Sequence, residues 1–342
     1  MNLRMTEMVA PLEAVQKARQ LLEDKKVMGM WTEKLDDGYS NLRILSSADQ
    51  TEAISDMLSE KFSSVEGFRI MLLPVEATIP HPEVSEEEGS AKEAREEIES
   101  PGRISREELY TDVTEGSELT PAYMGLVVLS TVVAGTGLIL GDVAVIIGAM
   151  AIAPLLVPNV SFSLSATLGD LELGWRSLKV NAAGFLAVLA ISIVMGMLFT
   201  VEPGADEMIS RTMVSLKHII IALAAGSAGA LAFTRGASAS IIGVMVAVAL
   251  LPPLVVLGLL LGAGYLQLAV GAAILTFANL ICINLAGVVT FLAMGVGPRG
   301  WREEKQAKKS TRLAITIWFL LLLVFVVIIW YWGQFDVQAL LP

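Results

Sequence analysis

The spacing of hydrophobic residues changes near residue 118. Before this point, short apolar runs alternate with amphipathic stretches, whereas after it long apolar runs with few charges follow one another. A hydrocarbon core about 30 Å thick needs about 20 helical residues, so the second part is expected to span a membrane repeatedly. Seven segments qualify or nearly qualify: residues 121–141, 143–168, 177–200, 217–234, 238–262, 265–294 and 312–332.

The first part has the pattern of a small α+β domain. Leu12, Val15 and Ala18 recur at helical spacing, and Asp36-Asp37-Gly38 indicates a turn between two strands. The predicted order is β-α-β-β-α-β, which is typical of a ferredoxin-like or ACT-like unit that binds effectors, pairs with a copy, or serves as a structural module. The expected strands are residues 3–9, 27–34, 39–45 and 68–73, and the expected helices are 11–24 and 47–62.

Together these patterns predict a polytopic α-helical membrane domain joined to a small cytoplasmic α+β domain. Between the two, residues 80–105 lose hydrophobic periodicity and become acidic, which indicates a linker. The expected divisions are 1–79, the β-α-β-β-α-β domain; 80–118, the linker and a pre-membrane helix; 119–200, a first membrane repeat; 201–216, an external loop; 217–297, a second repeat; and 298–342, a basic cytoplasmic loop and a final transmembrane helix.

Composition agrees with this division. Hydrophobic residues make up 54% of the 342 positions and the mean hydropathy is +0.64, so we expect the lipid bilayer as a partner. Residues 1–118 carry a net charge of −13 and the rest +2, which argues against nucleic acid as a partner. The one cysteine, Cys282, lies in an apolar run and is expected to be a buried thiol.

The distribution of lysine and arginine predicts the orientation. Residues 298–312 carry Arg299, Arg302, Lys305, Lys308, Lys309 and Arg312. Basic residues near spans favour the cytoplasmic side. We therefore expect the protein in the plasma or inner membrane of the cell, with this stretch in the cytoplasm. This orientation also puts the N-terminal domain inside the cell and the C-terminus outside.

Two stretches 95 residues apart are near copies of each other. Residues 146–150 read Ile-Ile-Gly-Ala-Met and residues 241–245 read Ile-Ile-Gly-Val-Met. Further along, Pro158 matches Pro253 and Gly169 matches Gly264. The matching stretches lie in two longer repeats of three predicted spans each. Because three is odd, the second repeat enters the membrane from the opposite face, which gives a 3+3 inverted repeat.

Prolines are expected to break the second and fifth membrane helices. Each proline lacks an N–H and clashes with the preceding turn, and carbonyls freed at membrane depth must find partners. The alternating serines after Pro158 do not share one helical face, so a non-helical or re-entrant start is expected there. Breaks in an inverted repeat indicate a substrate pathway, with these candidate residues: Pro154, Pro158, Asn159, Ser161, Ser163, Asn181, Pro252, Pro253, Asn279 and Asn284.

Other interpretations of these residues are open. A single proline would favour an ordinary kink, whereas two matched breaks in an inverted repeat favour a pathway. For any single asparagine, helix packing is the better interpretation. Gly141-Asp142 and Gly169-Asp170 superficially suggest a two-aspartate protease, but they lack the Gly-x-Gly-Asp pattern and are predicted on opposite faces. We therefore expect no enzyme, no catalytic residue, no metal and no cofactor.

Several motifs resemble the uncharacterised membrane proteins catalogued as domain of unknown function 389. The motifs are residues 104–110 (ISREELY), 147–155 (IGAMAIAPL), 168–170 (LGD), 176–178 (RSL) and 73–78 (LPVEAT). The family pattern has Pro-Leu-Met-Gly-Pro where this chain reads Pro-Leu-Leu-Val-Pro at 154–158. The resemblance covers most of residues 1 to about 295 and implies a prokaryotic multi-pass membrane protein, with no substrate attached.

Two functions remain as hypotheses. The first is a transporter or channel for a small solute or ion that uses the two broken helices. The second is a membrane-anchored sensor or oligomeric scaffold that binds its ligand in the N-terminal domain. A homo-oligomer is compatible with both.

Overall fold

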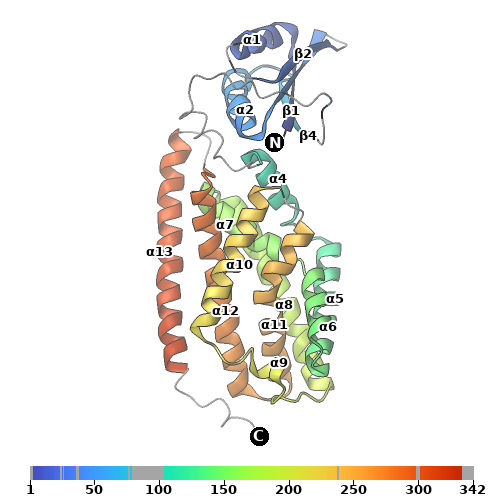
Figure 1. Ribbon diagram of the computed structural model, residues 1–342, viewed down its shortest axis with the longest axis vertical. Coiled ribbons are helices and arrows are strands. Elements are labelled where there is room, and N and C mark those ends of the chain that lie inside the picture. The colour runs from blue at the N-terminus through green and yellow to red at the C-terminus, as the bar shows by residue number, and fades with distance from the viewer. Residues whose placement is uncertain are drawn as a thin grey trace. The chain divides into compact units, whose positions relative to one another are not determined.

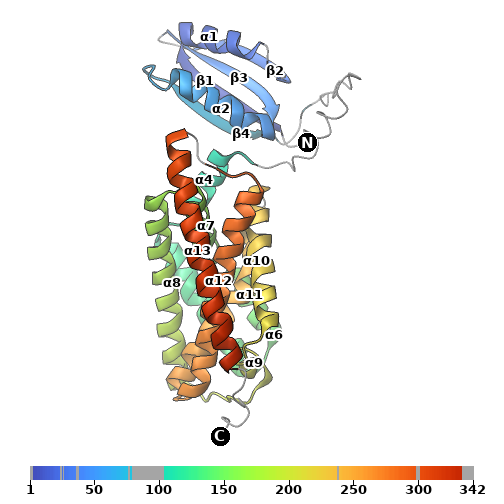
Figure 2. The same cartoon turned by 90° about the vertical axis from the view of Figure 1, so that its left-hand side faces the viewer.

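The computed structural model consists of two units, residues 1–110 and 111–342, which are described separately. It describes residues 3–23, 25, 27–35, 38–75, 78, 104–236, 239–297 and 301–332. The expected acidic linker falls almost entirely within 79–103, outside the described residues. Figure 1 and Figure 2 show the two units from two sides.

The first unit is a four-stranded antiparallel sheet with two helices. Its strand order is β2-β3-β1-β4, and the predicted alternation of strands and helices is the one found. The elements are β1 (Leu3–Pro11), α1 (Leu12–Leu22), β2 (Gly29–Lys34), β3 (Tyr39–Ser47), α2 (Ala48–Phe62) and β4 (Arg69–Val75). Alternate strand residues such as Met8 and Ile44 pack against Val15 and Leu58 of the helices, as expected for a sheet with one buried face.

Charged side chains attach the next helix, α4 (Arg106–Glu115), to this sheet domain. Arg106 lies 2.9 Å from Asp56 and 3.8 Å from Glu52 on α2, and Arg4 on β1 pairs with Glu108 at 3.0 Å. Burial alone would lower the pKa of Arg106, but the hydrogen bond to Glu107 and the nearby carboxylates raise it above its usual value. The guanidinium therefore stays charged at any physiological pH.

The second unit consists almost entirely of helices, most of which run alongside one another (Figure 1, Figure 2). Their bounds are α5 (Pro121–Leu140), α6 (Val143–Ile152), α7 (Leu156–Leu168), α8 (Leu171–Leu198), α9 (Asp206–Ile209), α10 (Leu216–Thr234), α11 (Ala239–Gly262), α12 (Leu266–Ala293) and α13 (Trp301–Trp332). Thr120 caps α5, accepting a hydrogen bond from the Tyr123 amide at 3.0 Å, with Pro121 in the first turn.

Four of the helices, α5, α8, α10 and α12, are long and apolar enough to cross a membrane. The pair α6–α7, bent by 52°, makes a fifth if it is counted as one span. The described apolar parts of α11 and α13 are shorter, residues 249–262 and 315–331. The chain thus has the character of a membrane protein, and the number of seven spans stays a prediction.

Three local expectations are wrong. The expected basic loop is helical from Trp301 onward, because α13 begins there. The chain after Pro158 is a regular helix, α7, and not a non-helical segment. The fifth membrane helix is not broken, since α11 continues through Pro252 and Pro253. The packing that explains the second is described with the site below, and the third is taken up with the contact of Asn279.

Candidate functional site

Helix α7 lies in the interior of the helical unit and, among the described residues, carries more buried polar side chains than any other helix of this unit. It contacts α8, α11, α12 and α13, and the ring of Phe162 meets that of Trp318 on α13 edge to face at 6.1 Å. Neighbours on several sides bury side chains that point in different directions. Alternating serines are therefore compatible with a regular helix here, which explains why the expectation of a non-helical segment was wrong. The buried polar residues of α7 are Asn159, Ser161, Ser163, Ser165 and Thr167.

Three asparagine side chains join α7 to α8 and α12. Nδ2 of Asn159 donates to Oδ1 of Asn181 at 3.0 Å, and Nδ2 of Asn284 donates to Oδ1 of Asn159 at 3.3 Å. Nδ2 of Asn159 also donates to the Leu155 carbonyl at 2.7 Å, and that of Asn284 to the Leu280 carbonyl at 2.9 Å. Because a carbonyl can only accept, these two bonds fix the orientation of both amides. The asparagines thus form a directed chain that ends with Asn181 as an acceptor.

Serine hydroxyls extend this amide chain. Oγ of Ser163 lies 3.2 Å from Oδ1 of Asn284 and 3.1 Å from the Asn159 carbonyl. A Cβ on Gly287 of α12 would come within 2.7 Å of the Ser163 hydroxyl, so the glycine permits this close approach. On the other side of α7, Ser177 of α8 donates to Ser161 at 2.8 Å.

Sequence reasoning did not select Ser177 or Gly287 for the site. A signal for each is present in the sequence: Ser177 precedes Asn181 by four residues and Gly287 follows Asn284 by three, so each shares a helical face with a predicted site residue. The structure therefore joins five predicted residues to two others. We call these seven the polar cluster: Asn159, Ser161, Ser163, Ser177, Asn181, Asn284 and Gly287.

The bend between α6 and α7 arises at Pro154. Helix α6 ends at Ile152, and Ala153 has an extended backbone with ψ of 120°, as the residue before a proline favours. Pro158 is the third residue of α7, where a helix makes no internal use of the N–H group. Pro158 therefore fits into the first turn of α7, and only Pro154 interrupts the path.

Pro252 and Pro253 are buried inside α11, away from the polar cluster. Their neighbours Leu251, Leu254 and Val255 belong to the large apolar core of the unit. Asn279 of α12 also lies apart from the cluster, and its Nδ2 donates to the Ala249 carbonyl of α11 at 2.7 Å. The structure thus places three of the ten predicted site residues around α11 and the rest on or beside α7.

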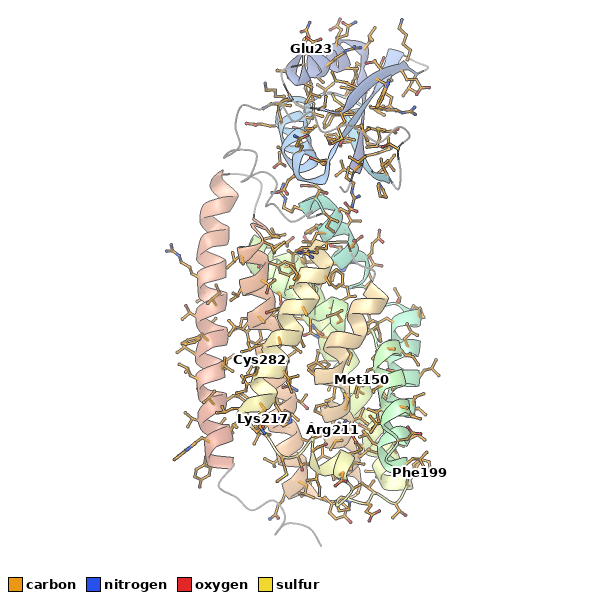
Figure 3. All side chains as sticks on the ribbon, viewed as in Figure 1. Glu23, Met150, Phe199, Arg211, Lys217 and Cys282 are labelled. Atoms are coloured by element: carbon orange, nitrogen blue, oxygen red, sulfur yellow. The ribbon has the colours of Figure 1, made fainter. Side chains whose placement is uncertain are left out.

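The polar cluster carries no ionisable side chain. Asp142 and Asp170 instead cap the starts of α6 and α8, accepting hydrogen bonds from Ala144 at 2.9 Å and Leu173 at 3.0 Å. Within the described residues, no group of three or more His, Cys, Asp or Glu side chains could hold a metal ion. Figure 3 shows the side chains of the helical unit, with Cys282 on α12, where it is buried as predicted.

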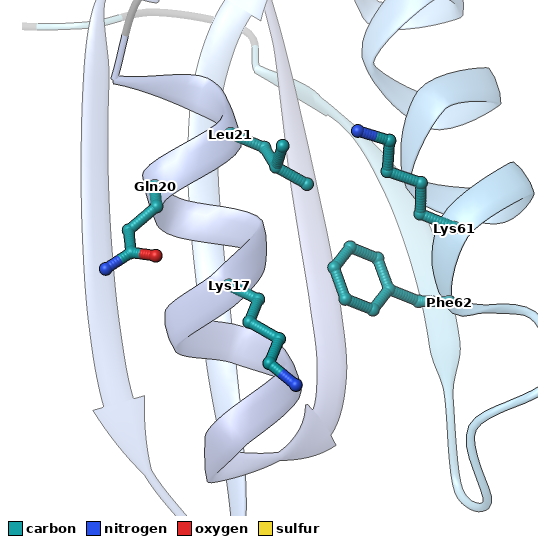
Figure 4. A pocket seen from close by; sticks show the side chains of 5 residues that line it. All are labelled: Lys17, Gln20, Leu21, Lys61 and Phe62. Carbon is teal, nitrogen blue, oxygen red and sulfur yellow. The ribbon is translucent and has the colours of Figure 1, made fainter.

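The N-terminal domain has an open groove of about 510 Å³ between α1 and α2. Figure 4 shows Lys17 and Leu21 of α1 on the side that faces Lys61 and Phe62 of α2; Gln20 of α1 also lines the groove. The groove combines two cations with an apolar floor, which suits an organic anion more than a neutral molecule.

Comparison with known proteins gives two matches. The family described as "Domain of unknown function (DUF389)" matches residues 150–285, a range that contains every residue of the polar cluster except Gly287. The uncharacterised protein MJ0678 of Methanocaldococcus jannaschii is 38% identical over 299 residues, which cover 87% of this chain and 90% of the relative. No solved structure matches.

Proposed function

This chain belongs to the DUF389 family, and we propose that it is an integral membrane protein that moves a small solute or ion across the bilayer. In this proposal the membrane part has seven spans, six of them forming a 3+3 inverted repeat, and α13 lies outside the repeat. The N-terminal domain is cytoplasmic and ferredoxin-like. The observation that carries the proposal is the buried, uncharged polar cluster that joins α7, the second helix of the bent pair, to α8 and α12.

Helix bounds support the inverted repeat. A shift of 95 residues carries the bounds of α8, Leu171–Leu198, onto those of α12, Leu266–Ala293. The same shift brings α5 onto α10, and α6–α7 onto α11, to within one residue at each end. Left-handed glycines recur at the same spacing, with φ of 74° at Gly169 and 87° at Gly264.

A pair of contacts supports the repeat at the level of single side chains. A Cβ on Gly287 of α12 would meet the hydroxyl of Ser163 on α7, and a Cβ on Gly258 of α11 would meet the hydroxyl of Ser192 on α8. The repeat relates position 163 to 258 and position 192 to 287. Both halves therefore use a serine against a glycine at the equivalent crossing, with the two residue types exchanged.

The polar cluster offers what a permeating solute needs at membrane depth. Amide and hydroxyl groups can replace hydration water around a solute or ion, and polar side chains inside membrane proteins commonly mark such pathways. Inverted repeats place their sites near the bilayer midplane, at discontinuous helices. The neutral cluster favours small polar solutes or weakly hydrated monovalent ions over multivalent ones.

Flux into liposomes tests this proposal. Purified full-length protein is reconstituted, and entry of urea, glycerol, sodium, potassium and chloride is followed by light scattering and ion-selective electrodes. We expect at least one of these probes to cross faster than in empty liposomes, and Asn159→Leu to abolish that flux. The matched control is Ser130→Ala, which removes a buried hydroxyl bonded only within its own helix, to Val127 at 3.1 Å. Flux equal to that of empty liposomes for all five probes would contradict the proposal.

The groove between α1 and α2 supports a second candidate function, ligand sensing by the N-terminal domain. Lys17 and Lys61 would hold the charge of an organic anion while Phe62 packs on its apolar part. Thermal shift of the full-length protein with a panel of aromatic carboxylates tests it. Lys17→Ala and Lys61→Ala should remove a shift that the exposed Lys34→Ala control retains; a shift equal in all three variants would contradict it.

A further inference from the structure

Helix α11 has a hydrogen-bonding deficit at its centre. Pro253 has no N–H group to donate to the carbonyl four residues earlier, which is that of Ala249. Ala249, Leu250 and Leu251 are buried, so water does not readily replace the missing donor. An unpaired carbonyl in such a place weakens or kinks a helix.

The side chain of Asn279 supplies the missing donor. Its Nδ2 lies 2.7 Å from the Ala249 carbonyl oxygen, the length of a strong hydrogen bond. Asn279 is 5% exposed, and among the described residues its Oδ1 is a buried acceptor without a hydrogen-bond partner. The Asn279 amide thus bonds to this carbonyl through its nitrogen while its own oxygen stays unpaired.

We infer that Asn279 is a positioning residue that keeps α11 continuous at Pro253, and that α11 bends at Ala249–Pro253 when this bond opens. The α6–α7 pair shows the other outcome: its chain bends by 52° at Pro154, and no side chain of the described residues donates to the carbonyl four residues earlier, that of Met150. The inference concerns the conformation of α11 and stands whether or not the protein transports a solute.

A substitution cycle between Asn279 and Pro253 tests this inference. Asn279→Leu removes the donor, and Pro253→Ala restores a backbone N–H that can reach the same carbonyl. The readout is amide hydrogen exchange of peptides covering residues 249–262 in full-length protein in detergent. The free energy of unfolding is a poor readout, because two effects of Asn279→Leu oppose each other. The substitution removes the unpaired Oδ1 of Asn279, which is favourable, and leaves the Ala249 carbonyl unpaired, which is unfavourable.

We expect exchange in this segment to be about threefold to twentyfold faster in Asn279→Leu, which corresponds to the measured strength of interhelical hydrogen bonds in membranes. The double variant should return to within about twofold of the natural protein. Thr276→Val is the matched control on α12, because the Thr276 hydroxyl bonds only to Ala272 of its own helix at 2.8 Å; it should leave exchange unchanged.

Two results would overturn the inference. One is exchange in Asn279→Leu equal to that of the Thr276→Val control. The other is a double variant that exchanges as fast as Asn279→Leu. That result would mean that Asn279 does not act through the Ala249 carbonyl, which Pro253 leaves without a backbone donor. If Asn279→Leu does not fold, recovery of folded protein on adding Pro253→Ala supports the inference, and failure to recover overturns it.

Discussion

The two proline-containing regions of the membrane part differ in shape although their sequences match. Residues 143–168 form two helices that meet at an angle, whereas residues 239–262 form one helix. Pro158 and Pro253 occupy matching positions of the two stretches, 95 residues apart, but Pro158 lies in the first turn of a new helix and Pro253 in the middle of a continuous one. On the inference above, the difference at Pro253 arises because the Asn279 side chain occupies the carbonyl that this proline frees.

The bent region depends on its asparagines, so the largest effect is expected at Asn159. Asn159→Leu removes two interhelical hydrogen bonds and leaves polar groups of Asn181 and Asn284 without their partner. We expect a loss of about 2–4 kcal/mol in the free energy of unfolding, measured by denaturant titration in detergent. Ser130→Ala should change it by less than about 0.5 kcal/mol. Equal effects of the two would show that the asparagine chain contributes no stability.

The continuous region depends instead on close packing of α11 against α8. A Cβ at Gly196 would lie 2.2 Å from the Leu259 carbonyl oxygen, and the backbone cannot move aside as a side chain does. Gly196→Ala should cost about 1–3 kcal/mol, measured in the same titration. Gly148→Ala is the control, since a Cβ there meets nothing within 4 Å; it should stabilise by up to about 1 kcal/mol. An unchanged free energy of unfolding in Gly196→Ala would mean that α8 and α11 pack less closely at this crossing than described.

The serine–glycine contacts allow the two halves to be compared directly. Gly287→Ala meets only the Ser163 side chain, whereas Gly258→Ala also approaches the Ile193 backbone nitrogen at 3.1 Å. We therefore expect Gly287→Ala to cost about 1 kcal/mol and Gly258→Ala more, within the range for overpacked cores. The double variant Ser163→Gly with Gly287→Ser exchanges the serine and the glycine, which copies the arrangement of the other half. It should recover part of the stability that Gly287→Ser alone loses. No recovery would speak against equivalence of the two crossings.

The smallest effect is expected at Pro158. Because this residue lies where a helix leaves its N–H groups unpaired, Pro158→Ala should change the free energy of unfolding by no more than about 0.5 kcal/mol. Thermal unfolding in detergent is sufficient to measure it. A loss above about 2 kcal/mol would show that the proline does more than begin α7.

The sequence predicted the helices well and the consequences of the prolines poorly. Long apolar runs with a polar residue at each start specify helix bounds locally, as at Thr120 and Asp170. The joining of Asn159, Asn181 and Asn284 was foreseeable because buried amides must find partners. The continuity of α11 was not foreseeable, because on our inference it depends on Asn279, which is 26 positions from Pro253 in the chain. A contact between residues so far apart exists only after the helices pack.

The absence of charge in the polar cluster has an electrical consequence. A membrane potential of 100 mV does about 2.3 kcal/mol of work on each elementary charge that crosses it, but it acts only weakly on amides and hydroxyls. None of the seven residues of the cluster titrates between pH 4 and pH 10. Rearrangement of these side chains would therefore be indifferent both to voltage and to the proton gradient, and any dependence on either would have to come from the solute itself.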